Sequence, residues 1–137
     1  MKTKLAITQK AVLLVAGSLL ILIGTFMLAS PVDFYASNSI ELGANVSLLN
    51  ELKAPAGLLL AAGMYMVGAI FVRSQADTAL SLAALIYLSY AASRFVSMVL
   101  DGAPAAGLVQ ASAVEGIVGI ACLAVLMIRR VPAGKAA

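Results

Sequence analysis

Residues 78–100 of the chain read TALSLAALIYLSYAASRFVSMVL, an apolar run that contains a single charged residue, Arg94. The run is long enough to cross the roughly 30 Å hydrocarbon layer of a bilayer as one helix. A charged side chain inside such a segment is costly unless it is paired, so Arg94 is a candidate for a polar site. The stretch therefore predicts a membrane-spanning helix with a polar group inside it.

Three further apolar runs accompany this one, over residues 11–30, 48–73 and 105–128. Hydrophobic residues make up 63% of the chain and charged residues 11%, and the mean hydropathy is +1.06. The runs are apolar on all sides, as expected when the solvent is lipid. We therefore predict an all-α fold, a single domain over residues 1–137, built as a membrane-spanning four-helix antiparallel bundle.

The first run has two interpretations. A secretory signal peptide would fit the preceding lysines and the small residues around Ala29, but the apolar run exceeds the roughly 7–15 residues of a signal core, which favours a retained helix. Ser30 followed by Pro31 and Asp33 is typical of a helix start, with Ser30 as the cap. We expect a short interfacial turn or helix there, whose Phe34 and Tyr35 lie at headgroup depth.

Other local signals concern the ends of the later helices. Ser47 is the expected cap of the second helix, and Pro55 near its entrance is expected to bend it. The short connection over residues 73–77 predicts that the second and third helices are antiparallel neighbours. Asp101-Gly102-Ala103-Pro104 is a strong turn signal before the last helix.

Basic residues gather on one side of the predicted bundle. Lys53 is near the other side, whereas the ends of the chain and the connection between the second and third helices carry Lys2, Lys4, Lys10, Arg73, Arg129, Arg130 and Lys135. The positive-inside rule then predicts cytoplasmic N- and C-termini in a multi-pass protein of the bacterial inner membrane. This distribution indicates anionic membrane lipids as partners and argues against nucleic acid.

Several kinds of chemistry are excluded by composition. The chain has no His and one Cys, Cys122, so a His-ligated haem, a His-based zinc site and a Ser-His-Asp triad cannot form within one chain. We predict no metal and no cofactor, and we interpret Cys122 as a packing residue.

The polar residues of the last two helices fall at similar depths. At a rise of about 1.5 Å per residue, Arg94 lies about 9 Å below the outer end of its helix and Glu115 about 13 Å below the same end. Glu51 and Lys53 lie at the outer mouth of the second helix. We predict that Arg94 pairs with Glu115, or with Glu51, or bridges both.

Arg94 also has polar neighbours on its own helix, with Tyr87 and Tyr90 toward the inside and Asp101 toward the outside. One interpretation is structural, since tyrosine hydroxyls bond across helices in membranes. The other is a small outward-facing polar pocket that binds a ligand. Both interpretations predict the same contacts.

Small residues predict packing faces. Gly17 and Gly24 lie two turns apart on the first helix, and Gly57, Gly63 and Gly68 lie on the second. Glycine lets two helix backbones approach closely in a membrane.

Three motifs together resemble a bacterial membrane-protein family, domain-of-unknown-function family 4345. They are NELKAPAG at residues 50–57, RFVS at 94–97 leading to DGAP at 101–104, and the later Glu115. In one departure, Ala56 stands where the family's pattern has the first Gly of a pair, which implies looser packing or a bend there. The resemblance implies a four-helix membrane protein without an assigned activity, and it singles out Glu51, Lys53, Arg94, Asp101 and Glu115.

Three functional hypotheses remain open. The first is a non-enzymatic accessory, assembly or interaction subunit of a larger membrane complex. The second is binding or transport of a small lipid-like, quinone-like or anionic ligand around Arg94 and Glu115, where transport would need a homo-oligomer. The third is a membrane enzyme with Glu115 or Glu51 as the acid–base group and Tyr90 as a donor.

Overall fold

The computed structural model of the protein describes residues 2–130, and within that range it is helical with no strand. The elements are, in order, α1 (Lys2–Ala29), α2 (Pro31–Ala36), α3 (Val46–Gly68), the short 3-10 helix η1 (Arg73–Gln75), α4 (Ala76–Asp101) and α5 (Ala106–Arg130). The expected all-α class is therefore confirmed. The short helix expected after the first run is α2, with Pro31 in its first turn.

Three segments are long and apolar enough to cross a membrane: Ala6–Ala29, Arg73–Asp101 and Ala106–Arg130. The helix α3 is not among them, because its first turns carry Glu51 and Lys53 and it ends at Gly68 instead of continuing to residue 73 as expected. Beyond Gly68 the backbone tightens, since the amides of Ile70, Phe71 and Val72 each bond to the carbonyl three residues earlier. Such bonds end an α-helix in a turn.

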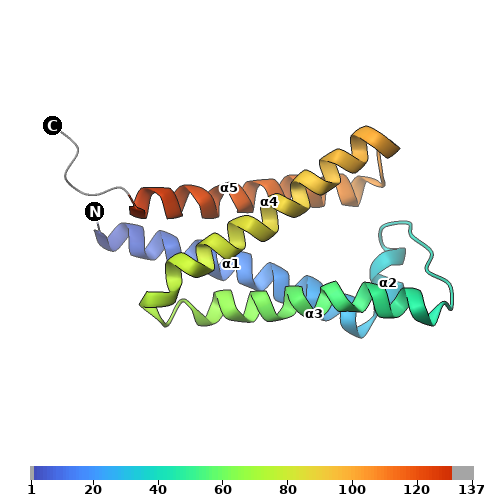
Figure 1. Cartoon of the computed structure of the whole chain (residues 1–137), viewed down its shortest axis with the longest axis horizontal. Coiled ribbons are helices and arrows are strands. Elements are labelled where there is room, and N and C mark those ends of the chain that lie inside the picture. The colour runs from blue at the N-terminus through green and yellow to red at the C-terminus, as the bar shows by residue number, and fades with distance from the viewer. Residues whose placement is uncertain (1, 131–137) are drawn as a thin grey trace.

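The long helices associate as two antiparallel pairs (Figure 1). One pair is α1 with α3, and the other is α4 with α5. The short connection between α3 and α4 does bring those helices into contact, but α4 then crosses α1 obliquely, and its distal end diverges from α3. The two pairs are therefore closest near the end where α1 begins, and they separate toward the end that carries α2. We call these the basic end and the α2 end.

Glycines explain why α1 and α3 lie so close together. A Cβ placed on Gly63 would lie 2.6 Å from the carbonyl oxygen of Gly17, and one placed on Gly24 would meet the α3 backbone at 2.7 Å. By contrast, no neighbouring atom of residues 2–130 lies within 4 Å of a Cβ on Gly57 or Gly68. The packing role expected of these glycines therefore applies to Gly17, Gly24 and Gly63, whereas an added Cβ on Gly57 or Gly68 would make no contact within the described residues.

The helix caps differ from the sequence expectation. Ser30 makes no capping hydrogen bond through its side chain. The cap of α3 is Asn45, whose Oδ1 accepts from the Leu48 amide at 3.1 Å, whereas Ser47 already lies in the first helical turn. Asn45 has the extended backbone of a cap residue (φ −77°, ψ 105°), and its short side chain reaches the free amide.

The core lies where the two pairs meet. Its fully buried side chains include Leu13 and Ala16 of α1, Met66 of α3, Leu80 of α4 and Cys122 of α5. Cys122 is a free thiol with no exposed surface, in agreement with its interpretation as a packing residue. The core thus holds the pairs together in the half of the molecule next to the basic end, and it leaves room near α2.

Candidate functional site

The charged side chains of α4 and α5 form an ion pair. The Nε atom of Arg94 donates to both carboxylate oxygens of Glu115, at 3.2 Å and 3.0 Å. The side chains are 31% and 13% exposed, respectively. Because α4 and α5 are antiparallel and joined by a short turn, residues at similar distances from that turn come to the same depth. The pairing keeps two partly desolvated charges from standing alone.

The ion pair borders a cavity of about 290 Å³ between the two helix pairs, toward the α2 end. Most of its wall is apolar, with Leu20 and Ile23 from α1, Leu59 from α3 and Ile86 from α4 among the lining residues. Sites for small molecules are typically apolar hollows of roughly 300–1,000 Å³ with a few convergent polar groups. This cavity lies just below the small end of that range.

The tyrosines on the wall fall into two classes. The Tyr87 hydroxyl donates to the backbone carbonyl of Ala16 at 2.7 Å, and the residue is only 2% exposed, so this hydroxyl ties α4 to α1. Tyr90 and Tyr35 also line the cavity, but within residues 2–130 no hydrogen bond engages either hydroxyl. Within the described chain, the hydrogen-bonding capacity of these two hydroxyls is therefore unused.

The guanidinium of Arg94 has spare donors as well. Its bonds within the described chain use only Nε, whereas a guanidinium carries five N–H donors, four of them on its two terminal nitrogens.

Burial raises the pKa of the Tyr35 phenol above its ordinary value of 10, the nearby Tyr90 adds to this rise, and Arg94 opposes it. The Tyr35 phenol therefore stays protonated at neutral pH, and Tyr90 and Arg94 are the two neighbours that affect its pKa.

The short helix α2 closes part of the site. The Phe34 ring makes edge-to-face contacts with Phe26 at 5.4 Å and with Tyr35 at 5.3 Å between centroids, which fixes α2 against the end of α1. Asn38 follows α2, and its Oδ1 lies 2.8 Å from where a Cβ on Gly107 would stand, in the first turn of α5. The segment after α1 therefore reaches over to the second helix pair.

The seven residues predicted for the site do not all come together. Tyr87, Tyr90, Arg94 and Glu115 border the cavity, whereas Glu51, Lys53 and Asp101 are exposed outside it. Asp101 accepts a hydrogen bond from the Ser97 hydroxyl at 2.9 Å, at the end of α4.

The separation of Glu51 from Arg94 follows from the splay of the helix pairs. Since the distal part of α4 diverges from α3 (Figure 1), the entrance of α3 is carried away from the ion pair.

Sequence reasoning missed Tyr35 and Asn38. Tyr35 was expected at headgroup depth, and Asn38 was not singled out. The available signal was the aromatic pair at residues 34–35 on a helix started by Pro31, since a short helix right after a span can fold back over the bundle.

Within residues 2–130, no group of three or more His, Cys, Asp or Glu side chains is placed so that it could hold a metal ion.

The family described as Domain of unknown function (DUF4345) matches residues 8–126 of the chain, which is most of its length. No curated protein and no solved structure matches it.

Proposed function

The chain belongs to the DUF4345 family, and from this starting point we propose that it is an integral membrane protein that binds a small amphipathic ligand in the cavity beside Arg94. One observation carries the proposal. An apolar hollow of about 290 Å³ has hydrogen-bond donors on its wall that no group in residues 2–130 uses.

The hydrogen-bond donors among the lining residues indicate which head group the ligand would carry. Arg94 supplies free N–H donors, and Tyr35 and Tyr90 supply hydroxyls, while the carboxylate of Glu115 is already paired with Arg94. Such a wall favours a head group rich in acceptors, such as a carboxylate or a carbonyl, over an ammonium group. The apolar lining suits a short hydrocarbon or ring portion behind that head group.

The membrane arrangement belongs to the same proposal. We infer that α3 is a fourth span, because it exposes large apolar side chains such as Leu58 and Met64, at 66% and 56%. Four spans in an antiparallel bundle place both termini on one side, and the basic residues of that side favour the cytoplasm of a bacterial inner membrane. The cavity near the α2 end would then face outward.

Thiol labelling in intact cells tests this topology. Ala44→Cys places a thiol in the exposed loop before α3, and Ser74→Cys places one in the exposed connection before α4. A membrane-impermeant maleimide should label only the first, and the native Cys122, with 0% exposure, gives little background. Labelling of both positions, or of Ser74→Cys alone, contradicts the proposed orientation.

Ligand binding is tested with three amphiphiles of equal chain length: decanoic acid, decanol and decylamine. The protein in maltoside micelles is heated, and unfolding is followed by reaction of Cys122 with a thiol-reactive fluorophore, since the thiol is fully buried in the folded state. Decanoic acid should raise the unfolding midpoint most and decylamine least. Equal effects of the acid and the amine would contradict the assigned head-group chemistry.

A matched pair of variants locates the binding. Tyr90→Phe removes an unused hydroxyl from the cavity, so the apparent affinity for decanoic acid should fall about fivefold while the unliganded midpoint stays unchanged. Tyr65→Phe is the control, because the Tyr65 hydroxyl bonds to Gln75 Oε1 at 2.7 Å, away from the cavity lining. An unchanged affinity in Tyr90→Phe would place the fatty acid elsewhere.

The accessory-subunit hypothesis is the second candidate, and the outer part of α4 favours it. Phe95, Val99 and Leu100 are 67%, 68% and 75% exposed where α4 diverges from α3, so a helix of a larger complex or of a second copy can pack there. Purification in mild detergent tests this, with a partner recovered in fixed stoichiometry as the expected result. Recovery of the chain always alone and monomeric counts against it.

A further inference from the structure

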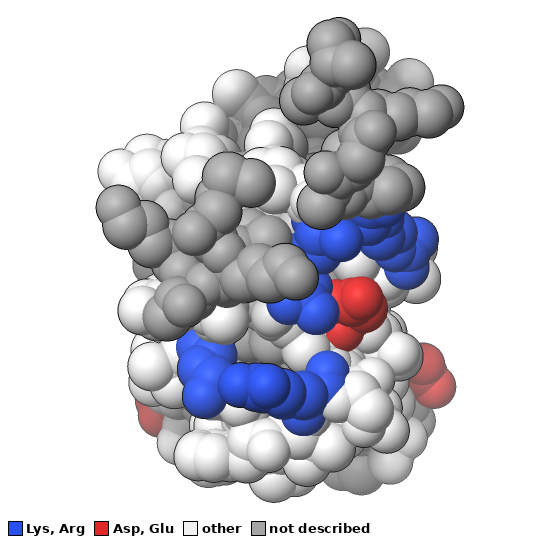
Figure 2. All heavy atoms as spheres, turned by 90° about the vertical axis from the view of Figure 1, so that its left-hand side faces the viewer, with Lys and Arg blue, Asp and Glu red and all other residues white. Residues whose placement is uncertain are grey.

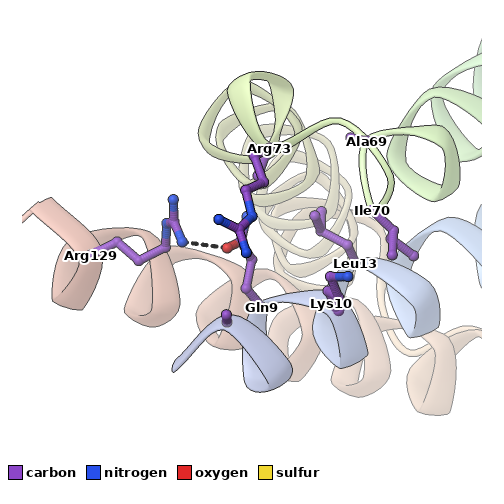
Figure 3. A pocket seen from close by; sticks show the side chains of 9 residues that line it. Gln9, Lys10, Leu13, Ala69, Ile70, Arg73 and Arg129 are labelled. Carbon is purple, nitrogen blue, oxygen red and sulfur yellow. Dashed lines mark hydrogen bonds between the residues drawn. The ribbon is translucent and has the colours of Figure 1, made fainter. Parts of the chain in front are cut away.

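A second hollow lies at the basic end, far along the bundle from the cavity beside Arg94. Its volume is about 390 Å³, and α1, the turn after α3, η1, the start of α4 and the end of α5 all contribute to it (Figure 3). Lysine and arginine side chains gather on this end of the molecule (Figure 2). We propose that this hollow binds the phosphate of an anionic phospholipid head group.

Three cations from three elements border the hollow: Lys10 of α1, Arg73 of η1 and Arg129 of α5. Figure 3 shows Arg73 and Arg129 reaching in from different elements, with Gln9 rising from α1 beside them. Arg129 also pairs with Asp77 at 2.6 Å. One carboxylate among three cations leaves a local charge of about +2.

Arg129 is fixed in place before any ligand arrives. Its Nε donates to Asp77, and one of its terminal nitrogens donates to Gln9 Oε1. Gln9 is only 5% exposed and Arg129 is 27% exposed, so the guanidinium is held at the edge of the core. Lys10 and Arg73 are exposed, and neither has an ion pair within residues 2–130. The hollow thus combines one fixed cation with two available ones, which suits a phosphate.

The floor of the hollow favours a lipid over a free phosphate ion. The hollow is also lined by Leu13, Ala69 and Ile70, which are apolar; Leu13 and Ala69 are buried, and Ile70 is partly buried. These apolar side chains make no favourable contact with a free phosphate ion, but they can contact the glycerol and first acyl carbons of a phospholipid. Basic pockets between helices at the end of apolar spans occupy the depth at which phospholipid phosphates lie. The inference needs the helices to lie in a membrane, but it does not depend on the cavity beside Arg94.

The test compares three probes in the Cys122 unfolding assay: short-chain phosphatidylglycerol, phosphatidylcholine of the same chain length, and inorganic phosphate. Phosphatidylglycerol should stabilise the protein at concentrations at which the other two do not. Arg73→Gln removes one available cation and should weaken the apparent affinity about fivefold. Arg130→Gln is the matched control, since Arg130 is an exposed arginine of the same end that does not border the hollow.

Each result decides the matter. A loss in Arg73→Gln but not in Arg130→Gln supports a defined lipid site, and Lys10→Gln should reproduce that loss if Arg73→Gln yields no folded protein. Equal losses in Arg73→Gln and Arg130→Gln would mean diffuse attraction to charge, which overturns the proposal. Stabilisation by inorganic phosphate to the same extent would make the hollow a phosphate site, and equal stabilisation by phosphatidylcholine would remove the charge selectivity. Either outcome overturns the assignment.

Discussion

The close contact of α1 with α3 predicts that Gly63→Ala is strongly destabilising. The added methyl carbon would stand 2.6 Å from the Gly17 carbonyl oxygen and 2.9 Å from both the backbone nitrogen and Cγ1 of Ile21. Two of these three atoms belong to the backbone of α1, so no side-chain rotation relieves the clash and the helices must move apart. Overpacking of this kind costs about 1–3 kcal/mol.

The matched control is Gly57→Ala in the same helix, where a methyl group meets nothing within 4 Å. This substitution should be neutral or stabilise the protein by up to about 1 kcal/mol, because alanine favours the helix over glycine. The two variants should therefore differ by about 1–4 kcal/mol in the free energy of unfolding, with Gly63→Ala the less stable.

Unfolding by increasing sodium dodecyl sulfate in mixed micelles measures this difference. Circular dichroism reports the helices, and the reactivity of Cys122, which is buried in the folded state, reports the core. If Gly63→Ala is as stable as Gly57→Ala, the backbones of α1 and α3 do not approach as the structure has them, and the reasoning is refuted.

The remaining predictions use the same titration. Arg94→Gln and Glu115→Gln each leave a partly buried charge unpaired and should cost about 1–3 kcal/mol, whereas the double variant should recover part of this loss; additive losses would mean that the pair contributes nothing. Tyr87→Phe removes the bond from α4 to α1 and should cost about 1 kcal/mol; an unchanged midpoint would contradict it. Asn45→Ala should lower the free energy of unfolding by about 1 kcal/mol through the lost cap, while Ser47→Ala should have little effect. A larger loss in Ser47→Ala than in Asn45→Ala would instead identify Ser47 as the cap of α3.

The sequence predicts the features that depend on one helix or on a shared turn. Apolar runs give the helices, and the short turn after Asp101 brings Arg94 and Glu115 to similar depths. Gly102, with φ +96°, ends α4 in a conformation that L side chains rarely adopt, which explains why the turn signal was reliable.

Features that depend on packing between distant segments were not predictable. Arg129 bonds to Asp77 across 52 residues and to Gln9 across 120 residues, and no local pattern joins these positions. The same holds for Tyr35, which enters the cavity because α2 folds back against α1. Glu51 was expected near Arg94 because a compact bundle was assumed, and the splay of the two helix pairs removes it. Depth along a helix can be calculated from sequence, but the lateral direction of each helix cannot.

The hydrogen bond from Tyr87 to Ala16 lies at the boundary between two parts of the molecule that differ in how the helix pairs are joined. Between it and the basic end, side-chain bonds cross from one helix pair to the other, whereas from there to the α2 end no hydrogen bond within residues 2–130 joins the pairs. Widening that half would cost contacts between apolar side chains, together with the contact of Asn38 with Gly107, but no hydrogen bond between the pairs. In the proposed membrane arrangement, lateral pressure in the surrounding leaflet would act on this half of the bundle, and lipid packing would then influence entry into the proposed binding site beside Arg94.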